Sequence, residues 1–591
     1  MNKYLFIFTI SPVQSFISQA RKLQDLYAGS KILTQLSKRA AEEFIIKNKG
    51  DIIFPYFDME NVNKKNESYP NRFLGIISTD NPEIIGKDIE SAVKNKYKEL
   101  FNQGLKYINL PKDKINDFFI NQIESAFSIR WVFYPFKEDD YISSYNNIER
   151  TLGALKNLRD FIQLEEKGRK CSLCGERNAL FYYYDPNKNK KFSFPFLDKE
   201  NAINLKNNLK SKITFTEGEG LCAVCFTKRF FDRDNKNSFS SIARVAMLDI
   251  LEVIEPLDSY KRIKNLLNMN FDEEILYEEN QTEEFFKKNY LPISALPHIK
   301  DSYKDILNIL KKEGLKQKKY YAVIMLDGDN MGKWLAGNFL TNKSDLKEFH
   351  IYLAKELSKY SAKVREIIDD KKGEVIYAGG DDVLAVVNLN YLFNLIYDLI
   401  NDFPSFNNSN INIIREGTAS MGVVISHYKT PFSEVLKWAH KMEEKAKKVD
   451  KEKNAVGIAV LKHSGDIKET IIKKNLIPIY IKILNILLKK EETNKKYIFS
   501  TTFIDKIEDE FKEAMVEGRL DDKFESLLIA EIDRLIERSI TNKDKYKNEL
   551  NKLKKLTLEF WEGINKINKS NNIHNFVMGL DILDFIIRKV Y

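Results

Sequence analysis

The chain has 591 residues, of which 43% are hydrophobic and 30% charged, enough for about three to five domains with solvated surfaces. This composition excludes a disordered chain, a collagen-like fibre and a small disulfide scaffold. The net charge of +9 permits nucleic acid or nucleotide partners without requiring them.

Nothing in the sequence predicts export or membrane contact. The first apolar run, residues 4–10, is too short for the core of a signal peptide, and no stretch approaches the ~18 apolar residues of a transmembrane helix. The four cysteines all lie in two CxxC pairs. We therefore expect a cytoplasmic protein without disulfide bonds.

We expect four domains, at residues 1–165, 166–315, 316–465 and 466–591. The first domain opens with a strand at 4–10, a turn at Ser11-Pro12 and a helix through residue 26. The second carries the four cysteines and then helices, one of them at 240–254. The fourth is mostly helical, with a helix face formed by residues at steps of three and four: Tyr546, Leu550, Leu553, Leu556 and Phe560.

The third domain alternates strands and helices. Residues 320–326 form an unbroken apolar run, typical of a strand that is covered on both faces. The pattern after this strand predicts, in order, a helix at 345–368, strands at 374–378 and 383–388, a helix at 390–403, a strand at 419–426, a helix at 431–449 and a strand at 455–461. This order is the split-βαβ, ferredoxin-like arrangement with one added helix–strand unit.

A weak internal similarity links the first and third domains. Residues 4–23 and 321–340 both read as a strand, a short polar loop and a helix. Two related domains in one chain would explain this, and coincidence is the alternative for so short a match. The first copy lacks the carboxylates of the second.

Three aspartates give the strongest chemical signal. Asp327 ends the first strand of the third domain, and Asp381 and Asp382 follow Gly379 and Gly380 between the second and third strands. In this topology the first and third strands are neighbours, so the three carboxylates should meet at one sheet edge. Carboxylate clusters suit Mg²⁺ or Mn²⁺, and two such ions can activate a hydroxyl and stabilise leaving pyrophosphate. The glycines permit a tight turn and close approach of a nucleotide; an ordinary exposed turn is the alternative.

The loop after Asp327 opens a helix. Backbone N–H groups at a helix start can bind phosphate, which makes Gly328, Asp329 and Asn330 candidate nucleotide contacts. Simple N-capping by Asp329 or Asn330 is the alternative. The helix at 431–449 carries lysines of which one or two could reach a triphosphate, although such a run is more often a solvated face: Lys441, Lys445, Lys447 and Lys448.

The second strong signal is a pair of CxxC motifs, Cys171 with Cys174 and Cys222 with Cys225, separated by 47 residues. Four thiolates predict a tetrahedral Zn²⁺ site of structural type. A redox dithiol pair is the alternative. None of the six histidines is followed by aspartate, so no HD-type hydrolase motif is present.

Together these residues resemble the large, polymerase-like subunit of type III CRISPR effector complexes, in particular the type III-B form. The motifs that carry the resemblance are SPVQSFI at 11–17 with ARK at 20–22 and DLYAGS at 25–30, PNRF at 70–73, the cysteine pairs, LDGDNMG at 326–332 and YAGGDD at 377–382. The C-terminal block matches only in being helical.

The resemblance implies an α+β multidomain fold with two ferredoxin-like palm (nucleotidyl cyclase-like) domains, a zinc-bearing middle domain and a C-terminal helical domain. It implies that the second palm converts ATP to cyclic oligoadenylate when guide RNA in the type III-B complex pairs with target RNA. Carried over to this chain, Asp327, Asp381 and Asp382 hold Mg²⁺ or Mn²⁺, and Lys447 or Lys448 contacts phosphates. The first palm contributes through the loop with Ser11 and Gln14.

One departure concerns nuclease activity. Many relatives begin with an HD domain that cuts single-stranded DNA, whereas this sequence starts at the first palm and has no HD dipeptide. The acceptor of the adenylate also stays open, because relatives without the HD domain join AMP to other small molecules such as S-adenosylmethionine. The competing classes are a diguanylate cyclase-like enzyme, a nucleic acid polymerase and a catalytically silent RNA-binding scaffold.

Overall fold

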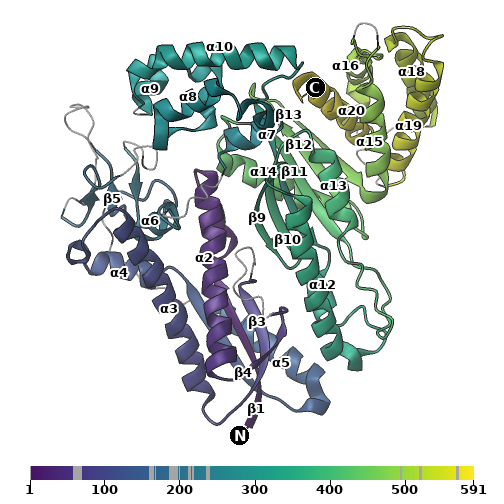
Figure 1. The fold of residues 1–591 in the computed structure, drawn as a ribbon. Coiled ribbons are helices and arrows are strands. Elements are labelled where there is room, and N and C mark those ends of the chain that lie inside the picture. Colours follow the sequence, from purple (N-terminus) through teal and green to yellow (C-terminus); the bar gives the residue numbers. More distant parts are fainter. Residues whose placement is uncertain are drawn as a thin grey trace.

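The computed structural model describes residues 2–57, 69–158, 166, 168–184, 197–198, 200–209, 215, 218–233, 240–289, 291–492, 495–517, 522–567 and 572–590. The boundary expected at residue 165 lies outside these residues. Figure 1 shows two sheets in the middle of the molecule, a cysteine-bearing segment beside the first sheet, and the C-terminal helices at the far end of the second sheet.

The first sheet has the order β2-β3-β1-β4, with strands β1 (Asn2–Ser11), β2 (Asp51–Phe54), β3 (Arg72–Thr79) and β4 (Ser128–Pro135). Its helices are α1 (Gln14–Ser18), α2 (Leu23–Glu42), α3 (Pro82–Tyr107), α4 (Asp117–Glu124) and α5 (Tyr141–Asn157). Along β1, Phe6 and Phe8 pack into the core that contains α2 and α3, while Leu5 and Ile7 pack into the core that contains α5. This alternation is the period of a strand buried on both faces.

The single helix predicted through residue 26 is wrong, because the structure contains α1 and α2 separated by a break. Lys22 has an extended backbone, and the carboxylate of Asp25 accepts hydrogen bonds from the backbone N–H groups of Arg21 and Lys22. This capping by the Asp25 carboxylate marks the start of a new helix at Leu23.

The described residues of the segment that follows form a small sheet of order β6-β5-β7 and a set of helices. The strands are β5 (Phe181–Tyr182), β6 (Ile203–Asn204) and β7 (Gly220–Leu221). The helices are α6 (Ala223–Arg229), α7 (Ile242–Ile254), α8 (Asp258–Leu267), α9 (Glu283–Lys288) and α10 (Leu296–Lys312). Helix α7, close to the predicted 240–254, packs against the second sheet at β8, β9 and β10.

The second sheet has six strands in the order β13-β12-β11-β8-β10-β9. They are β8 (Tyr320–Gly328), β9 (Gly373–Gly379), β10 (Asp382–Val387), β11 (Ala419–His427), β12 (Ala455–Leu461) and β13 (Ile467–Lys473). The helices are α11 (Met331–Leu335), α12 (Leu346–Ile367), α13 (Leu392–Asn401) and α14 (Phe432–Lys447). The expected ferredoxin-like order is confirmed, with β8 between β10 and β11, and the first sheet repeats the corresponding order.

Strand β13 corrects the division expected at residue 465. It pairs antiparallel with β12 over residues 467–473 and therefore belongs to the second sheet rather than to a helical domain. The C-terminal helices after it are α15 (Ile477–Leu487), α16 (Thr502–Glu510), α17 (Lys512–Glu517), α18 (Asp522–Ser539), α19 (Lys547–Asn565) and α20 (Asn572–Val590). The helix face predicted between residues 546 and 560 lies on α19, where Leu550, Leu553 and Phe560 are buried.

Two hydrophobic cores run through the molecule, and each of them contains residues of both sheets. One joins the α2 and α3 side of the first sheet to the cysteine-bearing segment and to α14 of the second sheet. The other joins the α5 side of the first sheet to α12 and to the C-terminal helices. Within the described part of the chain, no helix is long and apolar enough to cross a bilayer.

Candidate active site and metal centres

The three predicted aspartates lie together at one end of the second sheet. Their carboxylate oxygens lie within 4.8 Å of one another. Asp327 is the penultimate residue of β8, and β8 pairs with β10 through Leu326 and Val383, the residues next to Asp327 and Asp382. Adjacent strands therefore place carboxylates 55 positions apart in the sequence at a single edge.

The β9–β10 hairpin is tighter than the four-residue connection predicted from the sequence. Gly379 and Asp382 form its last pair, which leaves Gly380 and Asp381 as a two-residue tip. Gly380 has a φ of 75°, a conformation that side chains with a Cβ rarely adopt. The tip is tied to its surroundings because the Gly380 N–H donates to Ser361 Oγ at 3.1 Å and the Gly328 N–H donates to the Asp381 carbonyl at 3.2 Å.

Mutual repulsion and burial shape the electrostatics of the three carboxylates. Burial, together with the charge of Asp327, raises the pKa of Asp381 to about 6. Burial and the contact with Asp327 raise the pKa of Asp382 well above its ordinary value. A group of carboxylates that resists full ionisation is stabilised by a bound cation, so this donor set fits a divalent metal site.

Lys447 contacts one of the three carboxylates, Asp327, directly. Its ammonium group forms an ion pair with Asp327 Oδ2 and a second one with Glu443 Oε1 at 2.6 Å. Desolvation works against the charged lysine, but the two carboxylates outweigh it, and the pKa of Lys447 is raised. A permanent positive charge therefore stands beside Asp327.

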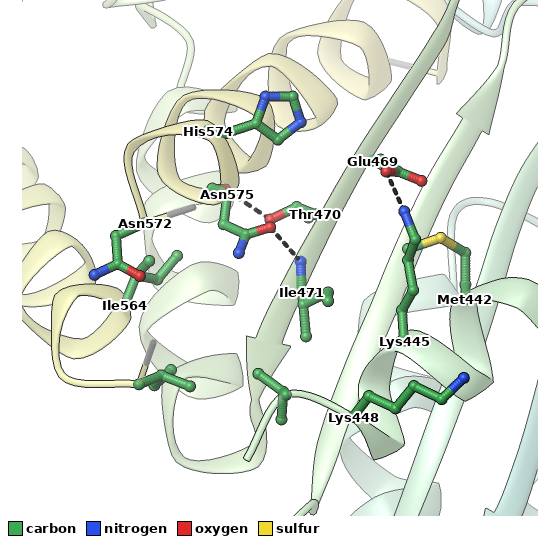
Figure 2. A pocket seen from close by; sticks show the side chains of 12 residues that line it. Met442, Lys445, Lys448, Glu469, Thr470, Ile471, Ile564, Asn572, His574 and Asn575 are labelled. Carbon is green, nitrogen blue, oxygen red and sulfur yellow. Dashed lines mark hydrogen bonds and ion pairs between the residues drawn. The ribbon is translucent and has the colours of Figure 1, made fainter. Parts of the chain in front are cut away.

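The other lysines at the end of α14 lie elsewhere. Lys445 and Lys448 line a cavity of about 250 Å³ between α14, β13 and the C-terminal helices, together with residues such as Ile564 and His574. Figure 2 shows Lys445 paired with Glu469 on one side of this cavity and Lys448 at its edge. The contact of Lys448 with phosphates stays a prediction, and the geometry favours Lys447 for that role.

The loop that begins at Gly328 leads into a short helix whose start has no side-chain cap. Helix α11 has five residues, and Asn330 precedes it with a φ of 59° and no side-chain capping bond. Asp329 is 1% exposed and accepts hydrogen bonds from other parts of the sheet. N-capping by either side chain is therefore wrong, whereas a nucleotide contact of this loop stays a prediction.

The loop of the first domain with Ser11 and Gln14 is held by protein contacts. Ser11 ends β1, and its hydroxyl donates to the Ser128 carbonyl at 3.4 Å. Gln14 begins α1. In the same helix, the carbonyl of Phe16 accepts a hydrogen bond from Lys228 Nζ at 2.6 Å. The predicted contact of Ser11 and Gln14 with a nucleotide stays a prediction.

The four cysteines converge as expected for a zinc site. The sulfur atoms of Cys171, Cys174, Cys222 and Cys225 lie within 4.8 Å of one another, and the Cys174 and Cys222 sulfurs are 3.8 Å apart. That separation agrees with the edge of a ZnS₄ tetrahedron built with Zn–S bonds of about 2.3 Å. The Leu173 and Cys225 N–H groups donate to cysteine sulfurs at 3.4 Å, which orients the sulfurs toward a common centre. The cluster therefore fits Zn²⁺ and leaves no position for a substrate.

Helix α6 connects this centre to the first domain. It begins at the second CxxC motif and ends at Arg229, which is fully buried. Arg229 forms a bidentate ion pair with Asp25 of α2, at 2.6 and 2.9 Å, and a second bidentate pair with Glu219, at 3.0 Å for both bonds. Asp25 belongs to the DLYAGS motif, so two distant motifs of the sequence form one structural unit.

A third acidic group, made of Asp505, Asp581 and Asp584, is neutralised by protein cations. Arg588 forms ion pairs with Asp505 at 2.7 Å and with Asp584 at 2.6 Å. Lys468 forms one with Asp581 at 3.1 Å. These contacts explain the cluster as a link between β13 and the C-terminal helices.

Sequence reasoning missed several residues around the carboxylates. Ser361 accepts a hydrogen bond from the hairpin tip. The sequence could not predict this contact, because no motif relates a helix residue to a distant turn. Glu443 could have been found, since it precedes Lys447 by four residues on a helix, the spacing of a side-chain ion pair.

The comparisons with known proteins agree with this geometry. Residues 320–457 match the family described as Cas10/Cmr2, second palm domain, and residues 5–102 match CRISPR-associated protein Cmr2, N-terminal. The CRISPR system Cmr subunit Cmr2 of Pyrococcus furiosus is 25% identical over 585 residues, which cover 80% of this chain and 63% of that protein. The chain thus spans less than two thirds of the length of this curated relative.

Two solved structures share the fold. The type III-B Cmr-beta complex in its apo state and the same complex bound to cognate target RNA contain chains that match with a TM-score of 0.64 each. Their sequence identities are 14% and 15%, and each match covers 99% of this chain and 82% or 83% of the other chain. The sequence comparisons therefore show that two regions of the chain, and most of its length, are similar to the Cas10/Cmr2 large subunits of type III-B CRISPR complexes.

Proposed function

We propose that this chain is a target-RNA-activated nucleotidyltransferase that converts ATP to a cyclic oligoadenylate or a related adenylate conjugate. The observation that carries the proposal is the convergence of Asp327, Asp381 and Asp382 at the end of adjacent strands, with Lys447 beside them. A silent scaffold has no need for three clustered carboxylates, two of which, Asp381 and Asp382, have pKa values that burial and the neighbouring charges push upward.

Each residue has a role in this reaction. The three aspartates would hold Mg²⁺ or Mn²⁺, which supply charge stabilisation and activation of an attacking hydroxyl. Lys447 offers a positive charge to the phosphates once Asp327 is engaged elsewhere. The hairpin tip, with no side chain at Gly380, leaves backbone open to a nucleotide. The contribution of the protein is positioning and electrostatic stabilisation, with no covalent intermediate.

The proposed partners follow from the family. The Cmr-beta structure bound to cognate target RNA concerns a protein of the same fold. We infer that this chain works in a complex with guide RNA, target RNA and other type III-B subunits. The off state in the absence of target RNA requires two conformations of different activity.

The test is a nucleotide assay on the assembled complex with α-labelled ATP, Mn²⁺ or Mg²⁺ and matched target RNA, with products identified by mass spectrometry. Asp381→Asn/Asp382→Asn should abolish product formation while target RNA stays bound. Asp305→Asn, an exposed aspartate on α10, is the matched control and should keep wild-type activity. A product that forms only with added S-adenosylmethionine would keep the site and change the acceptor. Complete absence of product with bound target RNA would favour the scaffold.

A further inference from the structure

Asp329 lies two residues after Asp327, yet its carboxylate is not part of the cluster formed by Asp327, Asp381 and Asp382. It is 1% exposed and accepts three hydrogen bonds from distant parts of the chain. The donors are Thr418 Oγ1 at 2.9 Å, Ser420 Oγ at 2.9 Å and the Asn454 N–H at 3.0 Å. Its own N–H donates to the Thr418 carbonyl at 2.7 Å.

The three donors come from segments that border the carboxylate site. Ser420 lies on β11 directly opposite Asp327 in the β8–β11 pairing. Asn454 ends the loop that leads from α14, the helix of Lys447, to β12. One carboxylate thus joins the strand end of Asp327, the neighbouring strand and the loop that follows Lys447.

The loop after Lys447 is also held from its other side. Lys473 of β13 forms an ion pair with Asp450 at 2.8 Å and donates to the Lys453 carbonyl at 2.5 Å. Asn454 has a φ of 50°, a strained conformation for a residue with a side chain. Fixed contacts are needed to keep such a backbone in place, and the Asn454 N–H bond to Asp329 is one of them.

We propose that Asp329 is a positioning residue of the carboxylate site, which sets the relative placement of Asp327 and Lys447 without contacting metal or nucleotide. This inference rests on the proposed function of the site. Both carboxylate oxygens already accept bonds from the protein, and the group is inaccessible to a ligand. It replaces the nucleotide contact expected of the Asp329 side chain.

A carboxylate is required for this arrangement. The amide of asparagine has one accepting oxygen and one donating nitrogen, so one of the three donors would meet an N–H group. Because Thr418 and Asn454 share Oδ2, the amide nitrogen would face Ser420 Oγ, and the buried Ser420 hydroxyl would lose its acceptor. A buried donor without an acceptor destabilises the local structure, and the contact of Asp329 with β11, at the position opposite Asp327, should weaken.

The first measurement is Mn²⁺ binding to the purified full-length chain, by electron paramagnetic resonance or titration calorimetry. Asp329→Asn should weaken Mn²⁺ affinity by about tenfold or more, the usual effect of replacing a residue that orients the metal ligands without binding the metal itself. The matched control is Asp249→Asn. Asp249 is a buried carboxylate that accepts from Lys318, Asn388 and Asn390 near the other end of β10, so its loss should lower stability with unchanged Mn²⁺ affinity.

The second measurement is ATP turnover by the assembled complex. Asp329→Asn should lower kcat, with KM for ATP changed by less than about threefold, because the residue positions the site and does not touch the nucleotide. A rise in KM with unchanged kcat would assign Asp329 to nucleotide binding and overturn the proposal. Unchanged Mn²⁺ affinity and unchanged turnover would overturn it as well.

If Asp329→Asn does not fold, Ser420→Ala and Thr418→Val each remove one donor and keep the carboxylate. Each should weaken Mn²⁺ binding by a smaller factor, and wild-type affinity in both variants would overturn the proposal. Failure of the proposed function can be distinguished from failure of this inference. A wild-type chain that binds Mn²⁺ but makes no product would refute the synthase activity, and the Mn²⁺ affinities of the variants would still test the role of Asp329.

Discussion

Arg229, at the end of the helix that follows the second CxxC motif, forms a fully buried bidentate ion pair with Asp25 on the second helix of the first domain. The pair joins the segment of the four-cysteine centre to helix α2 of the first domain, and its two residues are 204 positions apart in the sequence. Lys228 strengthens the same junction by donating to the carbonyls of Phe16 and Gln19 at 2.6 and 2.5 Å.

Arg229→Met should destabilise the chain by about 3–5 kcal/mol, because it leaves the carboxylates of Asp25 and Glu219 buried without their cation. Thermal unfolding or urea unfolding of the full chain measures this change. Lys87→Met, which removes an exposed helix pair with Glu83, is the control and should leave the melting temperature unchanged. Equal melting temperatures of Arg229→Met and wild type would contradict a structural role of the junction.

The four-cysteine cluster should contain one zinc ion per chain, which elemental analysis of the purified protein measures. Cys222→Ser should lose the metal and also loosen the junction, because Cys222 begins the helix that carries Arg229. We therefore expect faster proteolysis of the segment around α1 in the metal-free protein. Protein without zinc that resists proteolysis as well as wild type would contradict this coupling.

His350 makes the contact between the two domains dependent on pH. It is 1% exposed, its Nε2–H donates to the Leu335 carbonyl at 2.8 Å, and its Nδ1 accepts from the Tyr141 hydroxyl of α5 at 2.7 Å. Burial lowers the pKa of His350 from 6.5 to about 4. The unfolded chain therefore binds a proton that the folded chain does not, and stability that is present above pH 6.5 is lost as the pH falls toward 4.

The size of this effect is roughly 3 kcal/mol across that window. Urea unfolding at pH 7.5, 6 and 5 measures it, and His350→Gln should flatten the dependence, whereas His440→Gln, at an exposed histidine, should not. An unchanged pH dependence in His350→Gln would show that other groups cause it.

Gly380→Ala tests the hairpin tip separately from the carboxylates. The substitution meets no neighbouring atom but forces alanine into a φ of 75°, at a cost of about 1–2 kcal/mol. Gly465→Ala is a matched control, because Gly465 also has a positive φ and open surroundings but lies in the β12–β13 turn at the opposite end of the sheet. Both should lose similar stability, and only Gly380→Ala should lower ATP turnover; equal turnover in the two variants would refute a role of the tip.

The sequence predicted the second sheet well because its strands are strongly apolar and separated by clear turns. The run at 320–326 and the GGDD turn together determined which strands are neighbours, and so placed Asp327 beside Asp381 and Asp382. Strand β13 was missed because its sequence, IKETIIK, is half polar, as expected for a sheet edge that another element covers.

The roles of Asp329 and Asp25 could not be predicted, for a common physical reason. Both are carboxylates whose partners come from segments far away in the sequence, and a buried acid has no local pattern that distinguishes it from an exposed one. Local spacing did predict a lysine near the phosphates, but it could not separate Lys447 from Lys448, whose directions differ by one helix position, about 100°.

The order of the second sheet has a consequence for any attempt to study it alone. Its two outer strands are β9 and β13, and in the whole chain α2 of the first domain lies against β9 while α20 lies against β13. A fragment of residues 316–473 would expose two strand edges with free backbone hydrogen-bonding groups, which promotes edge-to-edge association. This fragment should therefore precipitate or form fibrils when it is expressed by itself, and remain dispersed only with both ends of the chain attached.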